Sequence, residues 1–201
     1  MAKPRRVKPA ASIYAFGNRM GITYYLHEGR TKTGKPRYFF AKTIGDSALG
    51  AMPEGFEVSE SINGVVSVRR RTPGATAVPA ADVTAVEAAL ARHPHLNGYV
   101  ARAVGSAVVI FEPHPRPGEL RELAQRSGLG LRAEVFMKDR MKHAQYTPVM
   151  KFEREGTEYV VLRMTYRGKG GWSWPLQSGK LDNLARKFVP SIGTEAFFEL
   201  M

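Results

Sequence analysis

Ile22-Thr-Tyr-Tyr-Leu-His27 sets the fold of the first part of the chain, together with the related segment Arg37-Tyr-Phe-Phe-Ala-Lys42 that follows it. Both segments are rich in β-branched and aromatic side chains, which favour strands, and the polar residues 29–36 between them contain two glycines. A second pair of strand-like segments, residues 56–62 and 65–68, is joined by Asn63-Gly64, a strong signal for a tight hairpin. The sequence therefore predicts a small antiparallel β-meander over residues 21–71.

The segments that flank this meander contain little that favours a helix or a strand. Residues 1–20 contain two prolines, small residues and scattered charges with no sustained period, which predicts a flexible basic arm. Thr72-Pro-Gly-Ala-Thr-Ala-Val-Pro79 has two prolines among small residues, which predicts a linker over residues 72–80.

Residues 81–201 alternate helical and strand patterns. Helices are expected after Asp82 and from Pro117, strands at residues 99–102, 107–111, 146–153 and 159–166, and a C-terminal amphipathic helix from Leu181. In that last helix Leu181, Leu184, Ala185 and Phe188 follow the spacing of one buried helical face. The predicted fold class is α+β: an N-terminal antiparallel β-meander followed by a mixed strand and helix region that ends in an amphipathic helix.

The composition narrows the possible chemistry. The 201 residues contain no cysteine, which excludes disulfides, thiolate metal sites and a cysteine nucleophile. The net charge is +12, and residues 1–42 hold ten basic side chains against the single acidic residue Glu28. A charge concentrated at one end of a chain indicates an acidic partner rather than a general effect on solubility.

Two stretches resemble a widespread family of uncharacterised bacterial proteins. The first is Tyr25-Leu-His-Glu-Gly-Arg-Thr-Lys-Thr-Gly-Lys-Pro-Arg-Tyr-Phe-Phe40 with the later Pro53-Glu-Gly-Phe-Glu57, and the second is residues 181–200 with Pro190-Ser-Ile-Gly-Thr-Glu-Ala-Phe-Phe-Glu199. No function is assigned to this family, so the resemblance implies a shared architecture that includes both ends of the chain, and no activity.

The basic residues predict contact with RNA or single-stranded nucleic acid, because Lys and Arg neutralise phosphates and aromatic rings stack on unpaired bases. Tyr38 is a candidate for stacking, although strand alternation places it with Phe40 on one face and Phe39 on the other, and at least one of these faces must be core. Trp172 and Trp174 are a second candidate for stacking or a cap on the core. The candidate basic contacts are Arg5, Arg6, Lys8, Arg30, Lys32, Lys35 and Arg37, with Lys138, Arg140 and Lys142 as a further segment that is most simply a solvated loop.

Two other functions are compatible with the same residues. The basic arm could dock an acidic protein partner, which would make the chain a protein-interaction module. A metal-dependent enzyme could use His93, His95, Glu112 and His114, because imidazole and carboxylate groups bind zinc or manganese. The alternative for these histidines is an ordinary position in proline-rich turns.

The sequence lacks the usual catalytic motifs. It contains no phosphate-binding loop, no Gly-x-Ser-x-Gly and no Asp-x-Lys or Glu-x-Lys pair. An enzyme is therefore less well supported than a binding protein, and no cofactor is predicted. No long apolar run follows the basic start of the chain, and the longest apolar stretch, residues 103–111, is too short to cross a membrane, so a cytoplasmic location without membrane contact is expected.

Overall fold

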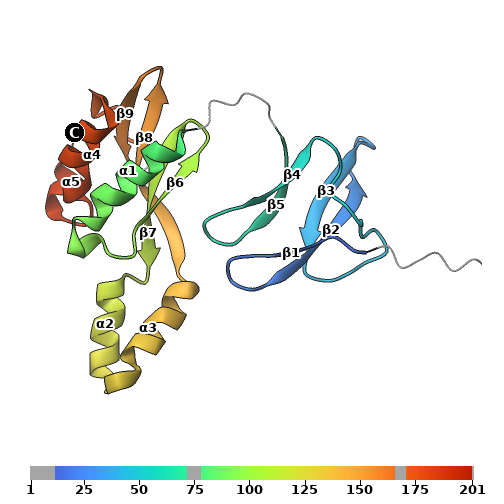
Figure 1. Cartoon of the computed structure of the whole chain (residues 1–201), viewed down its shortest axis with the longest axis horizontal. Coiled ribbons are helices and arrows are strands. Elements are labelled where there is room, and N and C mark those ends of the chain that lie inside the picture. The colour runs from blue at the N-terminus through green and yellow to red at the C-terminus, as the bar shows by residue number, and fades with distance from the viewer. Residues whose placement is uncertain (1–11, 72–77, 166–170, 201) are drawn as a thin grey trace, which may run out of the picture. The chain divides into compact units, whose positions relative to one another are not determined.

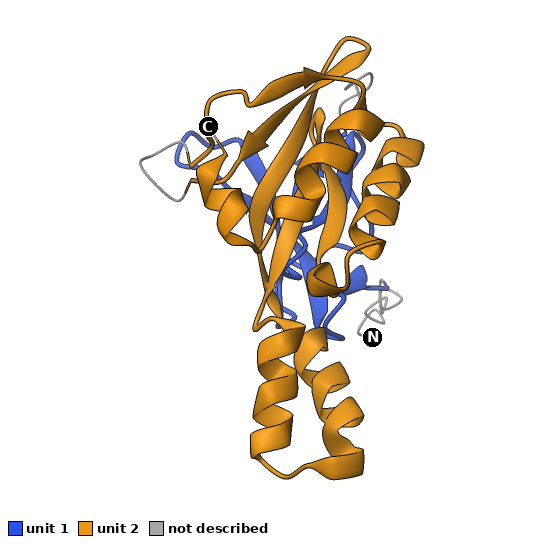
Figure 2. Ribbon diagram, turned by 90° about the vertical axis from the view of Figure 1, so that its left-hand side faces the viewer, with its two compact units in different colours: residues 1–73 blue, residues 74–201 orange. Residues whose placement is uncertain are grey.

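A computed structural model describes residues 12–71, 78–165 and 171–200. The chain divides into two compact units, residues 1–73 and 74–201, which are coloured separately in Figure 2. The α+β fold class and the N-terminal antiparallel meander are confirmed. Arg5, Arg6 and Lys8 lie outside the described residues, as do residues 1–11 of the predicted arm and residues 72–77 of the predicted linker.

Unit 1 consists of two small antiparallel sheets (Figure 1). The first has the order β1-β2-β3, and the second pairs β4 with β5. The strands are β1 (Ala15–Gly17), β2 (Thr23–Arg30), β3 (Pro36–Ala41), β4 (Phe56–Glu60) and β5 (Val66–Arg70).

The three-stranded sheet of unit 1 has an aromatic core. Leu26 on β2 is fully buried and pairs with Phe40 on β3, whose ring lies 6.3 Å from the rings of both Tyr14 and Phe16. A polar contact joins the β1–β2 turn to the β4–β5 hairpin, since the Asn18 side-chain amide donates to the Gly64 carbonyl over 2.8 Å. These contacts fix which face of the β2–β3 hairpin is buried.

Two predicted boundaries need correction. The predicted flexible arm extended to residue 20, but Ala15–Gly17 forms β1, because its backbone pairs with Thr23–Tyr25 of β2. The predicted linker extended to residue 80, whereas Ala80 is already the first residue of the first helix, directly after Pro79. Proline is well tolerated at the start of a helix, because backbone N–H groups there have no acceptor within the helix and the N–H that proline lacks is not needed.

Unit 2 is built on a five-stranded antiparallel sheet with the order β10-β9-β8-β7-β6. The strands are β6 (Val100–Val104), β7 (Ala107–His114), β8 (Gln145–Glu155), β9 (Glu158–Arg163) and β10 (Gln177–Gly179). The helices are α1 (Ala80–Ala91), α2 (Pro117–Arg126), α3 (Ala133–Lys142), α4 (Leu181–Phe188) and α5 (Glu195–Glu199), with short 3₁₀ turns η1 (Pro94–Leu96), η2 (Gly130–Arg132) and η3 (Val189–Ser191).

Helices α1 and α4 pack on one face of this sheet (Figure 1). The predicted amphipathic helix is confirmed as α4, and its four predicted core residues, Leu181, Leu184, Ala185 and Phe188, are all buried. From the sheet, Ile110, Met150 and Phe152 are fully buried in the same cluster. Helix α1 was expected to begin after Asp82, but Asp82 lies in its first turn and accepts a hydrogen bond from the Tyr159 hydroxyl on β9.

The segment between β7 and β8 is a helical hairpin that extends away from the sheet (Figure 1). Pro117 is the first residue of α2 as predicted, and the Arg116 amide donates to the Glu119 carboxylate over 3.0 Å at the start of this helix. Helix α3 occupies residues 133–142, where a solvated loop was the simplest expectation, and none of its residues is buried. Across the three described ranges, no helix is long and apolar enough to cross a membrane.

Candidate nucleic-acid interface

The β2–β3 hairpin carries four candidate basic residues, two on its tightly hydrogen-bonded turn and two on the adjoining ends of the strands. The Thr31 amide donates to the Lys35 carbonyl and the Gly34 amide donates to the Thr31 carbonyl, both over 2.9 Å. Gly34 has a positive φ of 78°, which glycine adopts without strain. The Lys35 amide also donates to the Thr31 hydroxyl over 3.1 Å. This hydroxyl therefore shapes the turn, and the turn presents its basic side chains from a fixed backbone.

We call this feature the basic turn, defined by Arg30, Lys32, Lys35 and Arg37. All four residues are exposed, and none of them forms an ion pair within the part of the chain that the structure describes. Glu28 on β2 also has no ion pair among these residues. The charge of the basic turn is therefore available to a partner.

A second set of cations in unit 1 differs from the basic turn because its side chains already have partners within the unit. The Arg69 guanidinium donates to the Glu57 carboxylate over 2.7 Å, and Arg71 lies 3.8 Å from the same carboxylate. The Arg70 guanidinium lies 5.6 Å from the centre of the Phe56 ring. The run of three arginines in the sequence is thus paired within its own hairpin, and only the basic turn offers unit 1 an unpaired cluster among the described residues.

The structure argues against Tyr38 as a stacking residue. Tyr38 is half-buried and packs edge-on against Phe56, with 4.9 Å between the ring centres. It shares the face of Phe40 and Leu26, which is the core face of unit 1. Strand alternation placed Tyr38 and Phe40 on one face without showing which face is core, and the structure packs their face against Leu26 and Phe56.

Phe39 is the aromatic residue that the sequence analysis did not select. It lies on the opposite face of β3 from Tyr38, two residues from Arg37, and 37% of its surface is exposed. Strand alternation already separated Phe39 from its neighbours, but the pattern contains no sign of which face the rest of the unit covers. Phe39 is therefore the exposed aromatic ring next to the basic turn.

In unit 2 the predicted basic residues lie on α3 and do not share one face. Lys138 and Lys142 are four residues apart and lie on one side of the helix, whereas Arg140 points to roughly the opposite side. The Arg140 guanidinium packs 5.3 Å from the centre of the Phe136 ring on the same helix. Asp139 and Glu134 add negative charge to α3. This segment is less concentrated in charge than the basic turn.

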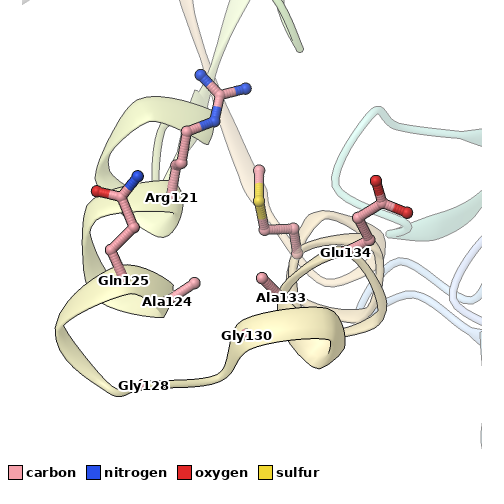
Figure 3. Close-up of a pocket in the computed structure, with 8 residues that line it drawn as sticks. Arg121, Ala124, Gln125, Gly128, Gly130, Ala133 and Glu134 are labelled. Atoms are coloured by element: carbon pink, nitrogen blue, oxygen red, sulfur yellow. The ribbon is translucent and has the colours of Figure 1, made fainter.

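A cavity of about 780 Å³ lies between α2 and α3. Figure 3 shows Ala124 and Ala133 pointing toward each other across it, with Arg121 on α2 and Glu134 on α3 at its rim. Its eight lining residues offer one guanidinium and one carboxylate from opposite helices. This lining lacks the cluster of cations that a phosphate backbone requires.

Trp172 and Trp174 do not form a joint platform. Trp172 is half-buried, and the Lys151 ammonium lies 5.1 Å from the centre of its ring. Lys151 in turn donates to Glu153 over 2.5 Å. Trp174, by contrast, is 90% exposed. The ring of Trp172 thus belongs to a contact on the sheet, and Trp174 remains as a separate exposed ring.

The four predicted metal ligands are not brought together. Among the residues that the structure describes, no group of three or more His, Cys, Asp or Glu side chains could hold a metal ion. The buried Glu112 carboxylate instead accepts hydrogen bonds from the Tyr99 hydroxyl over 2.7 Å and from the Arg116 guanidinium over 2.5 Å. His114 lies 3.7 Å from this carboxylate, and its Nε2 is 2.8 Å from the Thr147 hydroxyl.

Of the remaining two predicted ligands, His93 directly precedes the η1 turn and His95 lies in it. The rings of His93 and His95 are 5.8 Å apart. The Glu112 cluster therefore ties the end of β7 to the start of α2, and the metal-site prediction is replaced by this hydrogen-bonded anchor.

Comparison with known proteins finds no match, since no family model fits the chain and no curated protein or solved structure is significantly similar to it. The resemblance of residues 25–40 and 181–200 to a bacterial family stays a prediction.

Proposed function

We propose that this protein binds RNA or another single-stranded nucleic acid through the basic turn. The observation that supports the proposal most strongly is a group of four exposed cations on one fixed turn, with no ion pair to any described residue. Each cation that meets a phosphate releases condensed counterions, which favours binding at low salt. Arg5, Arg6 and Lys8 add positive charge at the start of the sequence.

The main competing function is an interaction with an acidic protein partner, because carboxylates would also satisfy the basic turn. The two ligands differ in spacing and in chemistry. A nucleic-acid strand offers a regular row of phosphates and unpaired base faces, whereas an acidic peptide offers carboxylates alone. Separate nucleic-acid and peptide probes therefore distinguish the two functions.

The test is a titration of a fluorescently labelled 20-nucleotide single strand, followed by anisotropy at 50 mM salt. The wild-type protein is compared with the variant R30Q/K32Q/K35Q/R37Q, for which we expect a loss of affinity of about tenfold or more. A control variant, R92Q/R126Q/K180Q/R186Q, removes the same charge from exposed positions of unit 2 and is expected to retain most of the binding.

Three results would contradict the proposal. One is the absence of binding to RNA and to DNA by the wild-type protein. Another is equal loss in both variants, which would indicate that net charge alone is responsible. The third is tighter binding to a poly-glutamate peptide than to either nucleic acid, which would favour an acidic protein partner.

A further inference from the structure

The ring of Phe39 is held in place by a buried neighbour. Phe39 on β3 pairs with His27 on β2, and their rings stack with 5.5 Å between the centres and 18° between the planes. His27 is only 4% exposed. Its Nδ1 lies 3.2 Å from the Ser47 hydroxyl and its Nε2 lies 3.0 Å from the Thr43 carbonyl oxygen. Because both ring nitrogens have partners, the imidazole is a fixed support under the phenyl ring.

The backbone beside this ring is tight for another side chain. A Cβ atom at Gly29 would lie 3.3 Å from Cε1 of Phe39, which is closer than most such contacts. Glycine at this position therefore lets the Phe39 ring lie close to the β2 backbone. The register also pairs Gly29 with Arg37, which places an unpaired cation on the same face of the hairpin as the ring.

These residues form a small surface with three properties. The Phe39 ring stacks on His27, 37% of the Phe39 surface is exposed, and Arg37 of the basic turn lies on the same face. A nucleobase stacks favourably on an exposed aromatic face, and such stacking is tolerant of sequence because every base has a flat face. In a duplex the bases already stack on one another, so a ligand that uses this surface must have unpaired bases.

We propose that Phe39 is a stacking site for one unpaired nucleobase, with Arg37 contacting the adjacent phosphate. This inference rests on the proposed function and sharpens it, because it assigns the preference for single strands to one ring. The basic turn supplies affinity for any phosphate chain, and Phe39 supplies discrimination between a strand with accessible bases and one without them.

The test uses three 20-nucleotide DNA probes of equal length: an ordinary single strand, a strand of the same length that lacks its bases, and a duplex. The wild-type protein is expected to bind the ordinary strand about 5-fold to 150-fold more tightly than the strand without bases, the range for one stacked base. The variant F39L keeps an apolar side chain and removes the flat ring, and it is expected to bind both strands equally.

Two further variants separate stacking from folding. F39W retains an aromatic face and is expected to keep the discrimination, which a merely structural role of the phenyl side chain does not predict. F198L removes an exposed phenyl ring in unit 2, where Phe198 is 67% exposed, and is expected to behave like the wild type.

The outcomes distinguish the two proposals. Binding of the wild type to all three probes with equal affinity would overturn the stacking site and leave the basic turn as the binding surface. Discrimination that persists in F39L would also overturn it. If the wild type binds none of the probes, and no RNA strand either, both proposals fail together.

Discussion

Replacing Glu112 by alanine is expected to destabilise unit 2, because the carboxylate of Glu112 joins three segments of it. The side chain is only 8% exposed. It accepts hydrogen bonds from Tyr99, just before β6, and from Arg116, just before α2. The variant removes both interactions and leaves the buried end of β7 without its anchor to the α2–α3 hairpin.

The size of the effect follows from the exposure of the two partners. A hydrogen bond to a buried charged group contributes about 1.5–3 kcal/mol, which applies to the Tyr99 hydroxyl. The Arg116 side chain is 47% exposed, so solvent screening reduces its ion pair to about 0.5–1 kcal/mol. We therefore expect the free energy of unfolding to fall by about 3 kcal/mol.

Urea unfolding followed by tryptophan fluorescence measures this change directly, because Trp172 and Trp174 are the only tryptophans and both lie in unit 2. For a urea dependence of about 2 kcal/mol per molar, the midpoint should fall by about 1.5 M. Glu87→Ala is the matched control: Glu87 pairs with Arg102 over 3.1 Å on the surface, and its loss should cost less than about 1 kcal/mol.

Two results would refute this reasoning. A midpoint for Glu112→Ala within the range of the Glu87→Ala control would show that the buried carboxylate anchors nothing. A rise in the wild-type midpoint on addition of Zn²⁺ or Mn²⁺, absent in Glu112→Ala, would instead restore a metal site at this position.

Two further predictions concern the same unit and use the same fluorescence. Burial and the hydrogen bond to the Asp82 carboxylate raise the pKa of Tyr159 from 10.0 to about 12. The stability that this hydroxyl contributes is therefore complete below pH 10 and is lost as the pH rises through 12, and Tyr159→Phe should flatten the fall of the urea midpoint across that window. Gly98 has a φ of +86°, and a Cβ atom there would lie 2.7 Å from Cγ of Pro117, so Gly98→Ala should lower the free energy of unfolding by about 2–4 kcal/mol. Gly105→Ala, with a φ of +60° and open space around it, should cost only about 1 kcal/mol, and equal losses in the two variants would contradict the steric argument.

Helices and strands whose local sequence pattern agrees with their final packing were predictable from the sequence. The spacing of Leu181, Leu184 and Phe188 identified one face of a helix, and the structure buries that face in α4. The β2–β3 hairpin was predicted because two segments of strand-forming residues flank a polar turn with glycines. In both cases the local preference and the final packing agree.

The side of a strand that becomes core could not be read from alternation alone. The pattern separates Tyr38 from Phe39 but treats the two faces alike. The choice is made by Phe56, which packs against Tyr38, and by the buried Leu26 on the same face. The sequence alone therefore does not identify Phe39 as the exposed ring.

Two other features of the structure could not be predicted from the sequence, for different reasons. Helix α3 buries none of its residues, so it has no apolar period, and only its helix-forming side chains favour it. The sequence marked Glu112 and His114 as candidate ligands by residue type, and these two side chains lie 3.7 Å apart. It contained no sign that Tyr99 and Arg116 already occupy the Glu112 carboxylate.

The salt dependence of binding tests the central role of the basic turn most directly. Affinity for a single-stranded probe is measured between 50 and 200 mM salt for the wild type and for R30Q/K32Q/K35Q/R37Q. Each phosphate contact to a single strand adds about 0.7 to the slope of log affinity against log salt. Four contacts therefore predict a slope that is steeper by about 2.8 in the wild type. Equal slopes for the two proteins would contradict the account, because the four cations would then meet no phosphate.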